Sequence, residues 1–375
     1  MRIAVNTRLL IKNKLDGIGW FSYESLKRIT QSHPEHQFYF FFDRPFSDEF
    51  IFSKNIEPII VGPPTRHPVL WYYWFEKKLP SVLNKINPDL FLSPDGYLSL
   101  TSKVKSVPVI HDINFTHYPK DLPYSTRLYY NYFFPQFAKK AERIVTVSEY
   151  SKQDIASTYH IEKEKIDVVY NGSNTIYKPI TDEKKVKAKN EYTNGSDYFV
   201  FIGSIHPRKN VSRMLMAFDK FRKLSPKPYK LIIIGSHFFK NREMKNTHKS
   251  LEYKKDILFF GHQSPENIKC LLGTARALIL ASKFEGFGIP VLEAMYCNVP
   301  SIISESTSLP EVGGNAALYV DPFSLDSISN AMIKIANDDK LRNQLIENGK
   351  IQRENFSWDK TAEKLWKSVL KATKS

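Results

Sequence analysis

The sequence has little of what stabilises secreted or membrane-spanning proteins. Only two of its 375 residues are cysteines, Cys270 and Cys297, which excludes a scaffold of several disulfides and fits a reducing compartment. No apolar run approaches the roughly 18 residues of a membrane-spanning helix. The first residues, Met1–Val5, predict a β-strand rather than a signal peptide. We therefore expect a cytoplasmic protein.

Motifs that bind metal ions are also missing. The chain has no His-Glu-x-x-His, no pair of cysteines at ligand spacing and no Asp-x-Asp motif. We expect neither a metal ion nor any other cofactor.

Acidic residues are outnumbered by basic ones. The chain has 54 Lys and Arg against 39 Asp and Glu, a formal net charge of +15, which indicates an anionic partner. Nucleic acid, an anionic membrane face and phosphate-bearing small molecules all satisfy this charge, and the charge alone does not choose among them. No nucleic-acid-binding module is recognisable, so we expect no nucleic acid partner.

The pattern of apolar runs predicts an α/β protein. The length suits two domains, and a content of 42% hydrophobic and 25% charged residues is typical of globular proteins. Most β-rich runs are apolar without alternation, as in parallel strands covered on both faces, and helical periods lie between them. The predicted strands are 3–5, 38–42, 59–61, 90–92, 107–110, 144–147 and 168–170, then 199–202, 231–234, 257–260, 278–280, 301–303 and 318–320. The sequence therefore predicts a doubly wound α/β domain that occurs twice.

The segment Asn171–Asp197 separates the two sets of strands. It is rich in Lys, Asn, Thr and Ser, and Asp182–Tyr192 within it predicts one charged helix. We place the domains at residues 1–178 and 179–356. A last helix is predicted over residues 357–375, with an apolar face of Ala362, Leu365, Trp366, Val369 and Leu370.

The most informative segment is Phe284–Met295, which follows an apolar strand. Two glycines flank Phe287 in a predicted turn, and Pro290 suits a first helical position. The backbone N–H groups and helix dipole at Gly288 predict a phosphate site. Glu285 is expected in the turn and Glu293 in the first helical turn, where neutral sugar or ribose hydroxyls suit carboxylates better than phosphate does. The alternative is an ordinary strand-to-helix turn with two solvated glutamates.

This segment resembles the Glu-x7-Glu signature of retaining glycosyltransferases of family 4, including Glu-Gly-Phe-Gly and Glu-Ala-Met. That family has the GT-B fold, in which two Rossmann-like domains face each other across a cleft. Its final helix crosses back onto the N-terminal domain, and Phe356-Ser-Trp358 resembles the entry to that helix. The resemblance implies donor-sugar contacts for Glu285 and ribose contacts for Glu293, with Phe287 and Gly288 in the nucleotide-sugar site.

The segment Pro207-Arg-Lys-Asn210 follows the first strand of the second half. Two cations in a βα loop of a parallel sheet can neutralise a diphosphate, although a solvated basic loop is as plausible from the residues alone. The segment resembles a recurrent family 4 feature in which the lysine binds the donor diphosphate, which implies this role for Lys209. Many members have an arginine where this chain has Ser204, so we infer that Arg208 supplies the second charge.

Two further elements resemble parts of the family's site. Gly17 and Gly19 lie in Asp16-Gly-Ile-Gly, which resembles the glycine loop that approaches phosphates and acceptor, although a structural turn is an equal alternative. His111 ends a strand where the family has a histidine that faces the donor sugar, and a structural histidine is the alternative. Asp112 either orients this imidazole or caps the following turn.

Three weaker candidates complete the set. Ser148 is an acceptor-side candidate that alternatively caps a helix over residues 151–159. His262 lies where the family holds the nucleobase. Two aromatic and basic stretches, 71–78 and 124–140, fit either helix packing or contact with an anionic lipid interface. A peripheral location at the inner membrane face would follow from the second reading.

The whole pattern predicts a metal-independent, retaining hexosyltransferase. Its motifs most resemble those of bacterial mannosyltransferases of O-antigen and polysaccharide assembly. We therefore expect GDP-mannose as the first candidate donor and a glycan or lipid-linked glycan as the acceptor. The alternatives are a glucosyl- or galactosyltransferase that uses a UDP-sugar, a synthase with soluble acceptors, a GT-B epimerase and a basic nucleic-acid-binding protein.

Overall fold

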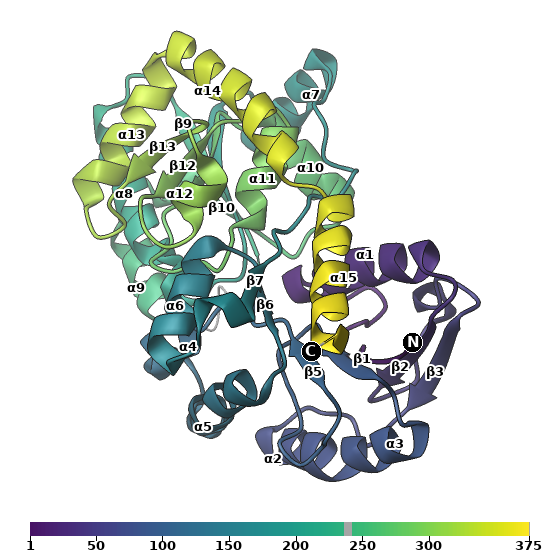
Figure 1. The fold of residues 1–375 in the computed structure, drawn as a ribbon. Coiled ribbons are helices and arrows are strands. Elements are labelled where there is room, and N and C mark those ends of the chain that lie inside the picture. The colour runs from purple at the N-terminus through teal and green to yellow at the C-terminus, as the bar shows by residue number, and fades with distance from the viewer. Residues whose placement is uncertain (236–241, 375) are drawn as a thin grey trace. The chain divides into compact units, whose positions relative to one another are not determined.

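A computed structural model describes residues 1–235 and 242–374 (Figure 1). The chain divides into two compact units. Unit 1 comprises Met1–Gly172 and the chain from Ser357 onward, and unit 2 comprises Ser173–Phe356. The boundary therefore lies before Ser173, whereas the sequence analysis placed it after residue 178.

Unit 1 contains a parallel sheet with the strand order β3-β2-β1-β4-β5. The order reverses between β1 and β4, as in a doubly wound domain. A second parallel pair, β6 and β7, continues from β5 through a bridge between Val109 and Val145. The Val109 N–H donates to the Ser93 carbonyl at 2.8 Å, so the backbone pairing of this segment with β4 continues one residue past Pro108. The strands are β1 (Arg2–Asn6), β2 (Gln37–Phe42), β3 (Ile56–Ile60), β4 (Leu90–Ser93), β5 (Ser106–Pro108), β6 (Ile144–Thr146) and β7 (Ile166–Val168).

Helices cover this sheet, and the last helix of the chain is one of them. The helices are α1 (Gly17–Ser32), α2 (Pro68–Tyr73), α3 (Leu79–Ile86), α4 (Asn114–His117), α5 (Tyr124–Lys140), α6 (Glu149–Tyr159) and α15 (Trp358–Lys374). Figure 1 shows α15 (yellow) beside α1 (purple), and the two helices are in contact. Ala362, Leu365, Trp366 and Val369 are buried as predicted, and Leu370 is half-buried.

Unit 2 contains a parallel sheet with the strand order β10-β9-β8-β11-β12-β13. The order reverses between β8 and β11, which makes the carboxyl ends of these two strands the expected ligand edge. The strands are β8 (Asp197–Ile202), β9 (Tyr229–Ile234), β10 (Ile257–Gly261), β11 (Ala277–Leu280), β12 (Ser301–Ser304) and β13 (Ala317–Val320). Leu278, Ile279 and Leu280 are fully buried, which explains the unbroken apolar run of β11.

The helices of unit 2 are α7 (Asp182–Thr193), α8 (Val211–Leu224), α9 (Arg242–Ser250), α10 (Pro265–Thr274), α11 (Ile289–Tyr296), α12 (Leu309–Gly313), α13 (Leu325–Asn337) and α14 (Asp339–Gln352). Helix α7 is the charged helix that the sequence predicts. Shorter helical turns are η1 (Asp48–Phe50), η2 (Trp74–Lys78), η3 (Pro119–Asp121), η4 (Lys163–Lys165), η5 (Pro207–Lys209), η7 (Lys254–Asp256) and η8 (Arg353–Asn355).

The prediction of two Rossmann-like domains is confirmed. Two predicted strands of unit 1 lie too late in the chain: 59–61 against β3 (Ile56–Ile60), and 168–170 against β7 (Ile166–Val168). Pairing nevertheless continues past β7, because the Val169 N–H donates to the Thr146 carbonyl at 2.8 Å.

Candidate functional site

Three strands of the unit 2 sheet end in glycines whose backbones lie close together. Gly203, Gly235 and Gly261 follow or end β8, β9 and β10, with φ angles of 154°, 159° and 60°. A Cβ on Gly235 would lie 1.8 Å from the Gly203 carbonyl oxygen, so only glycine fits there. These three glycines therefore expose backbone at the carboxyl ends of β8, β9 and β10, which lets a ligand approach closely there.

The turn between β11 and α11 has the geometry of an anion-binding helix start. Gly288 is the N-cap with φ 105°, and a Cβ there would lie 2.6 Å from Leu309 Cδ2. Because the helix begins at Ile289, Pro290 is its second residue and Glu293 its fifth. The expectation that Pro290 is the first residue and Glu293 lies in the first turn is therefore wrong. Gly288 supplies the cap one position earlier than the proline suggested.

A buried charge cluster forms beside this helix start. Lys209 Nζ lies 2.6 Å and 2.7 Å from the two oxygens of Glu285, and Arg208 Nη1 lies 3.1 Å from Glu285 Oε2. Arg208 Nη1 also donates to the Phe284 carbonyl at 2.8 Å. Glu285 is only 4% exposed. We call Arg208, Lys209 and Glu285 the charge triad.

The charge triad is ionised and carries a net positive charge. Burial alone would raise the pKa of Glu285, but Lys209 and Arg208, together with a hydrogen bond from Ser282, lower it to about 2. At neutral pH two cations therefore face one carboxylate. The predicted roles gave the cations to the diphosphate and Glu285 to the sugar, whereas the structure pairs them with one another. These roles stay predictions.

Several polar residues that the sequence analysis missed hold Glu285 in place. The Ser282 hydroxyl donates to Glu285 Oε1 at 2.7 Å. From the loop between β12 and α12, Thr307 Oγ1 accepts from the Glu285 N–H at 3.2 Å, and the Ser308 hydroxyl donates to the Glu285 carbonyl at 2.9 Å. Ser282, three residues before Glu285, offers a sequence signal. Thr307 and Ser308 offer none, because they belong to the loop after a different strand, 22 and 23 residues further along the chain.

Asn210, next to Lys209, fixes the loop that carries the two cations. Its side-chain amide donates to the carbonyls of Ala281 at 2.9 Å and Pro322 at 2.6 Å. The Lys283 N–H donates to the Arg208 carbonyl at 2.7 Å. The loop after β8 is therefore bonded directly to the turn after β11, which positions the cations before any ligand arrives.

Glu293 is a second carboxylate in the same unit, and its pKa is shifted in the opposite direction to that of Glu285. Burial raises its pKa to about 7, although a hydrogen bond from the Tyr177 hydroxyl acts to lower it. Glu293 is thus poised to change charge near neutral pH. Sequence analysis found Glu293 but not Tyr177, which lies 116 residues earlier in the chain.

His111 follows β5 in unit 1 and is neutral. Its Nε2 lies 2.8 Å from the Pro94 carbonyl, which can only accept, so Nε2 carries the proton. Burial lowers the pKa of His111 despite this bond and the nearby carboxylates. The ring meets Phe21 edge-on at 5.0 Å. Nδ1 is therefore a hydrogen-bond acceptor. Asp112 caps the following turn, since its Oδ1 accepts from the Asn114 N–H at 3.0 Å.

The glycine loop of unit 1 forms the start of α1. Asp16 is the N-cap, and its carboxylate accepts from the Gly19 N–H at 2.9 Å. Gly17 is exposed, and a Cβ on Gly19 would lie 3.1 Å from Leu15 Cδ2. The N–H of Gly19 is therefore already used, and the negative charge of Asp16 opposes an anion at this helix start.

The remaining candidates lie in differing surroundings. Ser148 caps α6, accepting from the Ser151 N–H at 3.0 Å, and is buried. Phe287 is buried against Phe356, with ring centres 5.6 Å apart. His262 and Ser204 are exposed.

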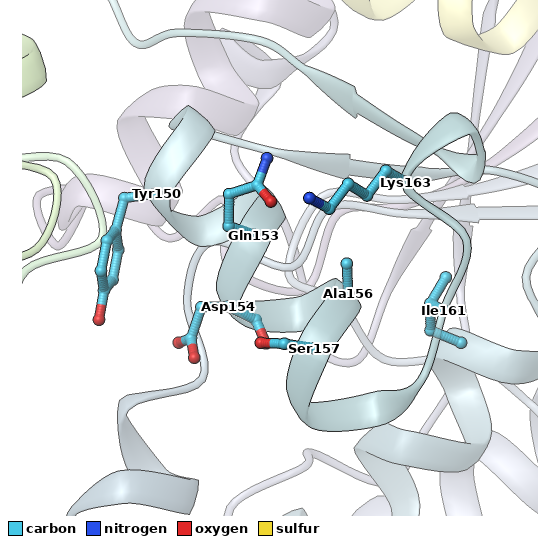
Figure 2. Close-up of a pocket in the computed structure, with 7 residues that line it drawn as sticks. All are labelled: Tyr150, Gln153, Asp154, Ala156, Ser157, Ile161 and Lys163. Atoms are coloured by element: carbon cyan, nitrogen blue, oxygen red, sulfur yellow. The ribbon is translucent and has the colours of Figure 1, made fainter.

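One surface hollow lies outside this set of residues. A depression of about 430 Å³ lies beside α6. Figure 2 shows the residues that line it, which are Tyr150, Gln153, Asp154, Ala156, Ser157, Ile161 and Lys163. None of the candidate site residues lines it. Within residues 1–235 and 242–374, no group of three or more His, Cys, Asp or Glu side chains is arranged to hold a metal ion. In the same described parts, no helix has the length and apolar character to cross a bilayer.

Both halves of the chain match known families. Residues 182–352 match the family described as glycosyl transferases group 1, and residues 16–176 match glycosyltransferase family 4. The chain is 26% identical to O-antigen chain mannosyltransferase B of Escherichia coli over 360 residues, 93% of this chain and 94% of that protein. It is 31% identical to O-antigen chain mannosyltransferase RfbU of Salmonella typhimurium over 258 residues, 68% of this chain and 67% of that protein.

A solved structure shows the same fold. The structure of HepE from Anabaena, in complex with UDP and glucose, has a TM-score of 0.75 and 15% sequence identity, with 99% of each chain covered. The protein is therefore a glycosyltransferase with the GT-B fold. It belongs to glycosyltransferase family 4, and the resemblance inferred from its motifs is confirmed.

Proposed function

We propose that this protein is a retaining hexosyltransferase that transfers mannose from GDP-mannose to a hydroxyl of a glycan or lipid-linked glycan. The single observation that carries the proposal is the net positive charge triad beside the capped start of α11. The names of the two O-antigen mannosyltransferases support mannose as the sugar and cell-surface polysaccharide as the product.

The charge triad suits a diphosphate leaving group. A diphosphate carries more negative charge than one carboxylate, so it competes with Glu285 for Lys209 and Arg208. The backbone N–H groups at the start of α11 add donors and a positive dipole end. Glu285 then turns its oxygens to hydroxyls of the donor sugar. Fixed cations stabilise the developing charge on the leaving phosphate, so a metal ion is not required.

Glu293 adds a second carboxylate to the donor site of unit 2 and accepts hydrogen bonds from the ribose hydroxyls. In unit 1, the neutral His111 has Nδ1 available as an acceptor for a hydroxyl, which fits the sugar contact that the sequence resemblance implies. Retention follows from attack on the face that the diphosphate leaves, with a phosphate oxygen accepting the proton of the acceptor hydroxyl. Positioning and electrostatic stabilisation then supply the rate enhancement, without a side chain as general base.

A thermal-shift panel with GDP, UDP, ADP and dTDP tests the donor. We expect GDP to raise the melting temperature most, because at equal ligand concentration the nucleotide that binds the folded state most tightly stabilises it most. If UDP stabilises the protein most, the donor is a UDP-sugar and not GDP-mannose. Stabilisation by none of the four would overturn the proposed donor site.

The product tests the stereochemistry and the metal independence. Transfer from GDP-α-mannose should give an α-linked product by NMR, and the rate should survive EDTA. A β-linked product contradicts retention, and activity that is lost in EDTA and restored by Mg²⁺ contradicts the metal-free mechanism. If the protein converts the nucleotide sugar to its epimer when no acceptor is present, it is an epimerase and not a transferase.

A further inference from the structure

Exposed apolar side chains gather on two neighbouring helices of unit 1. Helices α2 and α5 contact each other. Six large apolar side chains on them are between 40% and 67% exposed: Val69, Tyr72, Tyr73, Tyr124, Leu128 and Tyr132. We call these six residues the apolar face. Contiguous exposed apolar surface of this kind marks an interaction site more often than scattered single residues do.

The spacing on α5 separates this face from the core. Tyr124, Leu128 and Tyr132 follow one another at intervals of four and therefore share one side of the helix. The buried side of α5 is formed by Tyr129, Phe134, Phe137 and Ala138. The helix is thus apolar on two sides, and only one of them has a protein core to pack against.

The two helices form one continuous face. Tyr72 of α2 lies 6.1 Å from the half-buried Phe133 of α5, and Phe133 lies 4.9 Å from Tyr132, both between ring centres. Below them, Trp71 stacks on Tyr130 at 5.6 Å and donates to the Thr65 carbonyl at 3.0 Å. The exposed rings therefore belong to helices that are held together by packed aromatic side chains, including Trp71 and Tyr130.

A local feature of the chain orients this part of the surface. Pro80 has no N–H for the Glu76 carbonyl, so the helix widens to the π-helical turn η2, and Thr101 Oγ1 donates to that carbonyl at 3.3 Å. The Glu76 carboxylate is buried and accepts from the Leu100 N–H at 2.7 Å. Lys77 and Lys78, next in the chain, are exposed.

The charge around the apolar face has one sign. Between Arg66 and Lys85 the only carboxylate is the buried Glu76, and residues 122–141 contain no acidic residue. Lys78 Nζ lies 5.6 Å from the Tyr73 ring centre, and Arg127 Cζ lies 5.1 Å from that of Tyr124. Cations therefore lie against the exposed aromatic rings, with no exposed carboxylate in these segments to neutralise them.

We propose that the apolar face with Lys77, Lys78 and Arg127 is a docking surface for a lipid bilayer that contains anionic phospholipid. Tyrosine rings suit the boundary between headgroups and acyl chains, because one end is apolar and the other is polar. Long basic side chains reach from the same surface to the phosphates. A second copy of this chain, also with a net charge of +15, would bring like charges together.

Co-sedimentation of the full chain with vesicles tests this surface without any sugar substrate, so its outcome is independent of the proposed reaction. We expect binding to phosphatidylcholine vesicles that contain phosphatidylglycerol, and at least tenfold weaker binding to phosphatidylcholine alone. The triple variant Tyr124→Ser, Leu128→Ser, Tyr132→Ser and the double variant Lys77→Glu, Lys78→Glu should each lose binding at least tenfold.

A matched control removes exposed apolar residues from unit 2. The triple variant Val186→Ser, Leu224→Ser, Ile351→Ser takes away side chains of similar exposure and should bind vesicles as the unchanged protein does. An unchanged far-UV melt shows that each variant is folded. Equal binding to both vesicle types, equal loss in the control, or a dimer that the Tyr124 triple variant disperses would overturn the proposal.

Discussion

Replacing Glu285 with Gln tests whether the charge triad is held together by its carboxylate. The amide has nearly the same shape but no charge, so two largely buried cations lose their counter-charge. The fall of the Glu285 pKa from 4.5 to about 2 corresponds to about 3 kcal/mol at about 1.4 kcal/mol per pH unit. Since Glu285 is 4% exposed, solvent screening reduces this figure little.

We expect E285Q to unfold about 3 kcal/mol more easily at pH 7, which lowers the melting temperature by roughly 6–12 °C. The matched control is E347Q, which removes an equally short ion pair to Lys350 at 2.7 Å on the exposed surface and should cost less than about 1 kcal/mol. Urea denaturation and thermal melts measure both.

The pH dependence of this difference has a definite sign. A carboxylate with a depressed pKa in the folded state adds stability above its unfolded pKa, and this stability is lost as the pH falls through the folded value. The gap between the unchanged protein and E285Q should therefore be full above pH 4.5 and close as the pH approaches about 2.

The same variant separates binding from turnover. With one negative charge removed beside Lys209 and Arg208, GDP should bind about tenfold more tightly, whereas transfer should slow because the sugar loses a hydrogen-bond partner. Calorimetric titration with GDP and initial rates measure the two effects. A variant as stable as the unchanged protein at pH 7, with unchanged GDP affinity, would refute the reasoning from the triad.

Three further substitutions extend this test. Lys209→Ala should weaken GDP binding at least tenfold and slow transfer while the protein stays folded, and unchanged turnover would remove Lys209 from the site. Because the raised pKa of Glu293 gives stability below pH 4.5 that is lost as the pH rises toward about 7, Glu293→Gln should flatten stability over that range in urea titrations. GDP binding should strengthen between pH 6 and 8 as Glu293 ionises and becomes a better acceptor for the ribose hydroxyls. E293Q should abolish this pH dependence, and a dependence that persists in E293Q would assign it to another group. Gly288→Ala should cost about 1–3 kcal/mol, since φ is 105° and the added Cβ would meet Leu309, and an unchanged melting curve would contradict the geometry of the cap.

Local sequence patterns predicted most of the fold. The run Leu278–Leu280 is apolar without alternation because both faces of β11 are covered, so burial itself left the signal. The spacing of Ala362, Leu365, Trp366 and Val369 similarly marked the buried side of α15. The exact helix start did not follow, since Pro290 tolerates either of the first two positions and only the φ angle of Gly288 fixes the cap.

The site was predictable as a set of residues but not as an arrangement. Arg208, Lys209 and Glu285 each had a local signal, yet their mutual pairing has none. The Asp16 carboxylate accepts from the Gly19 N–H, so this N–H is not available to an anion at the glycine loop of α1. The sequence around His111 does not indicate its tautomer, because the tautomer depends on the carbonyl of Pro94, which directly follows β4.

The sequence by itself determined the two parallel-sheet domains, the family and the chemical types in the donor site. Only the tertiary structure decided which charges neutralise one another, which carboxylate titrates near neutral pH and which aromatic residues remain exposed. The physical reason is that strand and helix signals depend on neighbours in the chain. Charge pairing and burial depend instead on loops that the parallel sheet brings together from 76 or more residues apart, as with Lys209 and Glu285.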